Sequence, residues 1–133
     1  MRSKNLQGWM DYIEGAHDRA TLEPMLADDV TFISPVVHTP QEGKAITLAY
    51  LTAAGTSIGG SNFKYVREFD CGDRAVLEFT SQIDDIKING IDMFEWNDEG
   101  KITEIKVMIR PLKAIQKIHA KMGEALEAMK SKA

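Results

Sequence analysis

The stretch NGIDMFEWNDEGKI, residues 89–102, combines a strand pattern, a turn and the start of a second strand. Apolar and aromatic side chains fill its first half, and Asn97-Asp98-Glu99-Gly100 supplies the polar and glycine residues of a hairpin turn. Because the side chains of a strand alternate between its two faces, we expect Asp92, Phe94 and Trp96 on the same face. The stretch therefore predicts a hairpin that places one carboxyl group beside aromatic rings.

The hairpin extends in both directions into a meander of strands. Short polar connections separate four strand-like runs, and such connections join antiparallel neighbours because parallel pairing needs a long crossover. We therefore predict an antiparallel sheet. The expected strands are residues 63–69, 74–83, 86–96 and 101–110.

Helical patterns lie on both sides of this meander. Ser3 and Thr21 are the expected N-caps of the first two helices, Gly55 is the expected end of the third, and Pro111 ends the last strand before a long apolar stripe at helical spacing. Helices followed by a meander indicate an α+β class and one domain over residues 1–133. The expected helices cover residues 5–16, 20–26, 41–54 and 112 to about 129, with a first strand at 30–33 and a flexible connection at 55–62.

Composition narrows the classes of partner and compartment. A net charge of -4 without a basic stripe argues against nucleic acid as a partner. Cys71 is the single cysteine, which favours a reducing cytoplasm, and no stretch is long and apolar enough to predict a membrane span. We expect a cytoplasmic protein that contacts neither nucleic acid nor membrane.

Two segments resemble the SnoaL-like branch of the nuclear transport factor 2-like superfamily. LADDVTFISP, residues 26–35, is similar to the family's lead-in to its first strand, and residues 89–102 are similar to its hairpin. The resemblance covers residues 5–110 and implies the cystatin-like cone of ketosteroid isomerases and polyketide cyclases. In that fold a curved antiparallel sheet wraps around the N-terminal helices, and members commonly form homodimers through the outer sheet face. A long C-terminal helix is added here beyond Pro111.

Asp92 is the main candidate for chemistry. A carboxyl group desolvated among aromatic rings has a raised pKa and can act as an acid or a base; the alternative is an aspartate held by backbone amides, with no chemistry. Residues 90–94 resemble the ketosteroid isomerase segment that carries an oxyanion-hole acid, which implies that role for Asp92 with Tyr12 as its partner. Ser34 stands where that pattern has a base Asp, and this argues against steroid isomerase chemistry.

Other polar candidates are weaker. His38, in the loop after the first strand, is a candidate acid or base near neutral pH or else a surface histidine. His17 and His119 are interpreted as structural, and the spacing of the three histidines predicts neither a metal site nor another cofactor. The alternation of the last strand places Arg110 on the face opposite Asp92. The expected ligand-binding walls are Trp9, Ile13, Tyr50, Phe94, Trp96 and Val107.

Three functions remain open. The first is a cofactor-free acid–base enzyme of isomerase, cyclase or hydratase type, acting on a hydrophobic small molecule. The others are a non-catalytic module that binds a ligand or protein through the same cone, and a structural dimer accessory. A second titratable group within hydrogen-bond reach of Asp92 would favour the enzyme. Ile91, Met93 and Met108 on the outer face, and the apolar stripe of the last helix, predict a homodimer in which the sheet faces or the C-terminal helices pack together.

Overall fold

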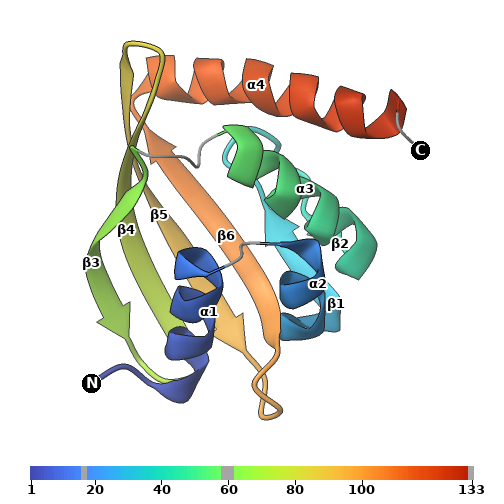
Figure 1. The fold of residues 1–133 in the computed structure, drawn as a ribbon, viewed down its shortest axis with the longest axis vertical. Coiled ribbons are helices and arrows are strands. Elements are labelled where there is room, and N and C mark those ends of the chain that lie inside the picture. Colours follow the sequence, from blue (N-terminus) through green and yellow to red (C-terminus); the bar gives the residue numbers. More distant parts are fainter. Residues whose placement is uncertain (16–17, 58–61, 132–133) are drawn as a thin grey trace.

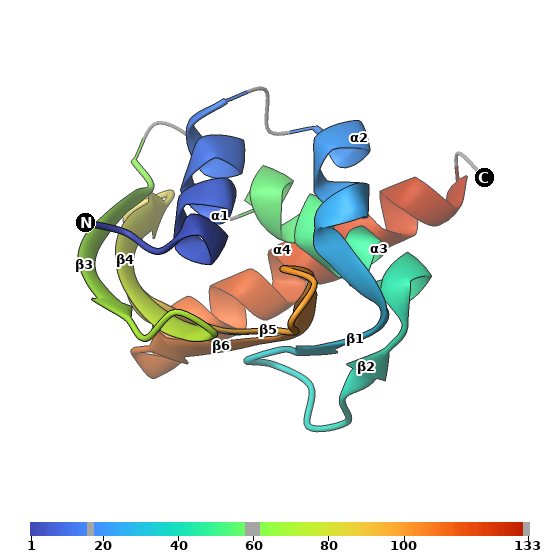
Figure 2. The same ribbon diagram turned by 90° about the horizontal axis from the view of Figure 1, so that it is seen from below.

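A computed structural model describes residues 1–15, 18–57 and 62–131, and it shows one curved sheet with helices on its concave side (Figure 1). Seen from below, α1 lies in the trough of the sheet (Figure 2). The strands are ordered β2-β1-β6-β5-β4-β3. The strands are β1 Leu26–Ile33, β2 Gln41–Glu42, β3 Lys64–Asp70, β4 Arg74–Ile83, β5 Ile86–Trp96 and β6 Ile102–Arg110. The helices are α1 Lys4–Glu14, α2 Arg19–Leu22, α3 Lys44–Ser57 and α4 Leu112–Ser131, with a 3-10 turn at Glu23–Met25.

The α+β class, the curved sheet and the long C-terminal helix are confirmed, and β4 and β5 have the predicted bounds. The meander from β3 to β6 is antiparallel. The expectation of an entirely antiparallel sheet is wrong, because β1 pairs with β6 in parallel. The long segment between β1 and β6 returns the chain to the same end of the sheet, as parallel pairing requires.

Several element boundaries differ from the predictions. The Asp18 side chain, not Thr21, caps α2 by accepting a hydrogen bond from the Thr21 amide. Residues 41–42 pair with β1 as β2, so the third helix begins at Lys44, and it continues through Gly55. β1 begins four residues earlier than expected and is irregular around its two aspartates. Ser3 caps α1 as predicted, while His17 and part of the expected 55–62 connection lie outside the described residues.

The concave face of the sheet carries the core that supports the pocket. Phe94 is buried against Trp9 of α1, with ring centroids 4.7 Å apart, and Trp96 stacks on Phe94. Gly90 lies under the Phe79 ring, where an added Cβ would be 2.6 Å from a ring carbon. This close approach explains a glycine in the middle of a central strand.

α4 closes one end of the cone and lies beside α3 (Figure 1). Its apolar stripe packs into a second core cluster with Phe79, Ile83 and Ile88 of the hairpin β4–β5. Ala114, Ile118 and Met122 of the stripe are buried. Residues of the same chain therefore cover much of the apolar stripe of α4.

Candidate functional site

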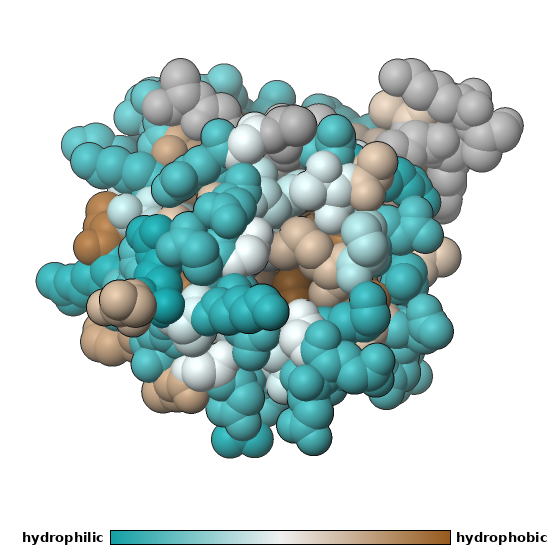
Figure 3. Space-filling view, turned by 60° about the horizontal axis from the view of Figure 1, so that its bottom comes forward, coloured by the Kyte–Doolittle hydropathy of each residue, from teal (hydrophilic) through white to brown (hydrophobic). Residues whose placement is uncertain are grey.

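A pocket of about 370 Å³ opens between α1, α3 and the concave face of the sheet. On the side of the molecule that carries α1, apolar surface lies at the bottom of a hollow surrounded by hydrophilic side chains (Figure 3). Asp92 is the carboxyl group among the pocket's described residues, and Tyr12 and Tyr65 supply hydroxyl groups. The remaining lining residues are Trp9, Ile13, Gly15, Phe32, Leu51, Ala54, Gly55, Phe63, Ile105 and Val107.

Strand register explains why Asp92 faces this pocket. Asp92 lies directly opposite Leu77 of β4 and Val107 of β6, and directly opposed residues of antiparallel strands share a face. Leu77 is fully buried and Val107 lines the pocket. Arg110, three residues beyond Val107, is exposed on the opposite face, as the alternation predicts.

A chain of hydrogen bonds runs from α1 through β3 to Asp92. The Tyr65 hydroxyl donates to Asp92 Oδ2 over 2.6 Å. The indole Nε1–H of Trp9 donates in turn to the Tyr65 oxygen over 3.1 Å. A donor that is itself hydrogen-bonded is polarised and becomes stronger. The Tyr65–Asp92 contact is therefore a short bond to a positioned carboxyl group.

Burial governs the protonation of this pair. Removal from water raises the pKa of Asp92 to about 6, although the hydrogen bond from Tyr65 acts in the opposite direction. Burial, and then the nearby Asp92 charge, raise the pKa of Tyr65 well above its ordinary value. Tyr65 therefore stays a hydrogen-bond donor across the physiological range, while Asp92 exchanges a proton near neutral pH.

The structure brings together most, not all, of the expected site residues. Trp9, Tyr12, Ile13 and Val107 line the pocket with Asp92, and burial raises the pKa of Tyr12. Phe94 and Trp96 are buried in the core instead of lining the pocket, because α1 covers their side of the sheet. Tyr50 packs on the ring of Phe32, and His38 is exposed in the loop after β1; neither is among the lining residues.

Tyr65 is the functional candidate that sequence reasoning missed. The expected partner of Asp92 was Tyr12, which lies in the same pocket. The sequence signal for Tyr65 was weak, because this residue lies between a charged and an apolar residue in a strand whose other side chains are exposed. Its partner could be identified only once β3 was placed beside β4 and curved over the pocket.

Ser34 takes no part in the pocket lining. Its buried hydroxyl accepts a hydrogen bond from the Val36 amide, 3.1 Å away, within the loop that follows β1. Within the described part of the chain, no group of three His, Cys, Asp or Glu side chains is arranged to hold a metal ion. No helix formed by the described residues combines the length and apolar character needed to cross a bilayer.

Comparison with known proteins gives a consistent picture. A steroid delta-isomerase from Pseudomonas aeruginosa is 30% identical, with a TM-score of 0.87, and the match covers 96% of this chain and 92% of that chain. A Silicibacter pomeroyi DSS-3 protein with a cystatin-like fold is 24% identical (TM-score 0.82; 91% and 84% covered). An NTF2-like protein of unknown function from Mesorhizobium loti is 20% identical (TM-score 0.67; 81% and 89% covered). No curated protein matches the chain.

The chain also matches the family model of the SnoaL-like domain. That model matches residues 6–105, from the first turn of α1 into β6, and leaves α4 outside. The matched range holds β1, β3 to β5, the first part of β6 and every residue that lines the Asp92 pocket except Val107. Because the match spans well over half of the chain, the protein belongs to the SnoaL-like domain family.

Proposed function

We propose that this protein is a cofactor-free acid–base enzyme of isomerase, cyclase or hydratase type, with Asp92 as its catalytic carboxyl group. The substrate is a hydrophobic small molecule held in the pocket. The observation that carries the proposal is a carboxyl group with a pKa of about 6, hydrogen-bonded to a second titratable side chain inside an apolar pocket. Efficient proton transfer needs a group whose pKa lies near the working pH.

The hydrogen bonds assign a role to each oxygen of Asp92. Oδ2 accepts the bond from Tyr65, so Oδ1 is left to exchange a proton with a bound ligand. The carboxylate form can remove a proton from an acidic C–H or O–H group. The protonated form can donate a hydrogen bond to an oxygen that gains negative charge in the transition state. Tyr12 is the second tyrosine whose side chain lines the pocket.

The described lining carries one carboxyl group, which restricts the chemistry. The pattern of a separate base and oxyanion-hole acid is incomplete here, since Ser34 occupies the base position and is bonded within its loop. We infer a reaction in which Asp92 both removes and returns the proton. An example is an isomerisation in which the proton moves between neighbouring positions on the same face of the substrate. The likeness to a protein described as a steroid delta-isomerase supports the isomerase class, not the identity of the substrate.

A non-catalytic binding module is the second candidate. The aromatic and aliphatic walls favour it, because they would hold an apolar ligand whatever the charge of Asp92. Under this alternative Asp92 and Tyr65 serve only to orient a polar group of the ligand.

Ligand capture separates the two candidates. Full-length wild-type protein and Asp92→Asn are each incubated with a hydrophobic metabolite extract, re-isolated and extracted for mass spectrometry. For an enzyme, the Asn variant is expected to retain a molecule that wild-type protein converts to an isomer or to a product differing by water. Recovery of one unchanged molecule from both proteins would identify a binding module. Val107→Trp, which fills the pocket, should retain nothing, whereas Leu112→Trp, at an exposed position outside the pocket, should behave as wild type.

We also propose that the protein forms a homodimer through the outer sheet face. Val66, Phe69 and Met108 are 43%, 58% and 50% exposed there, beside the ion pairs Arg67–Glu78 and Arg74–Glu95. Light scattering at micromolar concentration is expected to give twice the chain mass, and Met108→Lys should shift the protein towards monomer by placing like charges across a twofold axis. A wild-type monomer would refute this proposal.

A further inference from the structure

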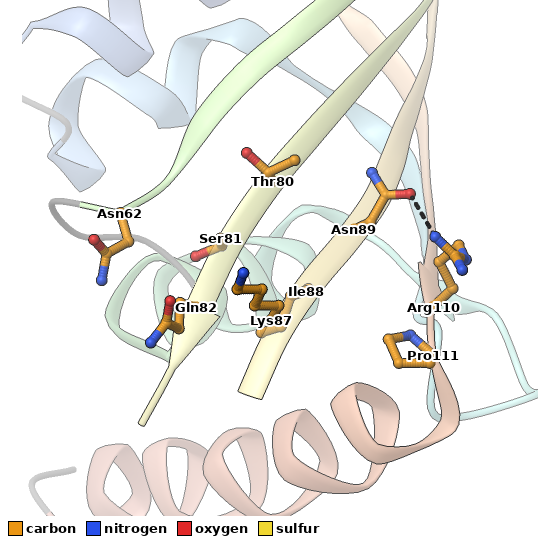
Figure 4. Close-up of a pocket in the computed structure, with 9 residues that line it drawn as sticks. All are labelled: Asn62, Thr80, Ser81, Gln82, Lys87, Ile88, Asn89, Arg110 and Pro111. Atoms are coloured by element: carbon orange, nitrogen blue, oxygen red, sulfur yellow. Dashed lines mark hydrogen bonds between the residues drawn. The ribbon is translucent and has the colours of Figure 1, made fainter. Parts of the chain in front are cut away.

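A second hollow lies at the end of the sheet, where β4, β5 and β6 meet the start of α4. It is a groove of about 460 Å³ and shares no lining residue with the Asp92 pocket. In the close-up the groove side chains spread over neighbouring strands, with Arg110 and Pro111 leading into α4 (Figure 4). Its lining residues are Asn62, Thr80, Ser81, Gln82, Lys87, Ile88, Asn89, Arg110 and Pro111.

The described lining of this groove carries positive charge only. Its charged lining residues, Lys87 and Arg110, are both cations, and in the described ranges neither forms an ion pair. Two other arginines of the same sheet do have carboxylate partners, in the pairs Arg67–Glu78 and Arg74–Glu95. Glu78, the carboxylate next to the lining residue Asn89, is already paired with Arg67, so the two cations of the lining create a local positive potential.

Neighbouring side chains orient the groove's donors. Asn89 Nδ2 donates to Glu78 Oε2 and to the Phe79 carbonyl, both over 3.0 Å, which fixes the orientation of the amide. Its oxygen then faces Arg110 Nη1 at 3.5 Å. This contact uses one end of the guanidinium and leaves its other N–H groups for a ligand. The Thr80 hydroxyl lies in the same cross-strand row as Asn89 and Arg110.

We propose that this groove binds a small organic oxyanion, a carboxylate or a phosphate monoester, with Arg110 and Lys87 as its cationic contacts. Guanidinium and ammonium groups bind both oxyanions through charge-assisted hydrogen bonds. The groove is far larger than a bare ion, so the organic part of the ligand lies along Pro111. Gln82 and Asn62 supply further polar contacts at the other end.

The test is a titration of the full-length, ¹⁵N-labelled protein monitored by amide chemical shifts. The probes are glycerol phosphate, benzoate and, as the neutral control, glycerol. Saturable shifts centred on Asn89 and Arg110 are expected with the two anions, and the anion that binds more tightly identifies the class. Arg110→Gln is expected to weaken binding about tenfold and Lys87→Gln about threefold. Lys106→Gln, the same charge change on the same sheet but outside the groove, should have less than about a twofold effect.

Three outcomes would overturn the proposal. Equal binding of glycerol would remove the role of charge, and an equal loss with Lys106→Gln would reduce the effect to the general field of the sheet. A change of oligomeric mass in Arg110→Gln with unchanged anion affinity would assign the groove to a subunit contact. Asp92→Asn should leave anion binding intact, so failure here and failure of the proposed catalysis are separate results.

Discussion

Asp92→Asn is expected to stabilise the folded protein at pH 7 by up to about 3 kcal/mol while abolishing turnover. The folded-state pKa of about 6 lies above the ordinary aspartate value of 3.8, and each unit of difference corresponds to about 1.4 kcal/mol. The unfolded chain therefore releases the Asp92 proton first as pH rises. The free energy of unfolding of the wild-type protein falls between about pH 4 and pH 6 and is level above that window.

The variant removes this dependence because asparagine carries no charge to desolvate. Its carbonyl oxygen still accepts the Tyr65 bond, and its amide faces the pocket. Among the described lining residues, the titratable groups that share the pocket with Asp92 are Tyr12 of α1 and Tyr65 of β3, while those of α3 and β6 carry no charge. Urea unfolding from pH 4 to pH 8 measures the difference, with Asp98→Asn in an exposed turn as the control for charge. Destabilisation of Asp92→Asn at pH 7 would mean that Asp92 is structural.

Tyr65→Phe is expected to move the pKa of Asp92 further above 6 and to destabilise the protein at pH 7 by about 1–3 kcal/mol. The carboxylate loses the hydrogen bond that favours its charged form, and the buried Trp9 indole N–H loses its acceptor. The acidic limb of any pH–rate profile should shift to higher pH with the pKa.

A ¹³C NMR titration of the Asp92 carboxyl carbon tests this without a substrate. Tyr12→Phe is the matched control, since it removes a hydroxyl from the same pocket but not the one that donates to Asp92 Oδ2. Trp9→Phe, which removes the indole N–H, should shift the pKa in the same direction as Tyr65→Phe by a smaller amount. A larger shift with Tyr12→Phe than with Tyr65→Phe would restore Tyr12 as the partner of Asp92.

Local alternation was enough to place Asp92 and Val107, because every second residue of a strand shares a face. The same rule correctly placed Phe94 on the same face as Asp92. It could not determine which residues of that face line the pocket and which are buried in the core. That distinction depends on where α1 lies, and Trp9 covers Phe94 while leaving Asp92 open to the pocket. Coverage by another element is a tertiary property that strand periodicity does not contain.

Pairings between distant segments explain most other differences. Gln41 and Glu42 follow a helical pattern in sequence, but their backbone groups pair with β1, and tertiary pairing overrides weak local propensity. Tyr65 was not predicted as a partner of Asp92 because a register shift next to it, between Tyr65 and Arg67, bends β3 in a way that spacing alone does not reveal.

The parallel pairing of β1 with β6 has a consequence for the order of folding. Phe32 of β1, a wall of the pocket, lies opposite Ile105, close to the end of the family-matched range. β2 follows β1 closely in the chain, but the other edge of β1 cannot pair until β6 has been synthesised, and such non-local pairing slows folding. Until β6 pairs with β1, apolar side chains of α1 and β1 remain exposed. The Asp92 pocket is therefore among the last parts of the molecule to be completed, and a truncated nascent chain would expose the same surface to aggregation.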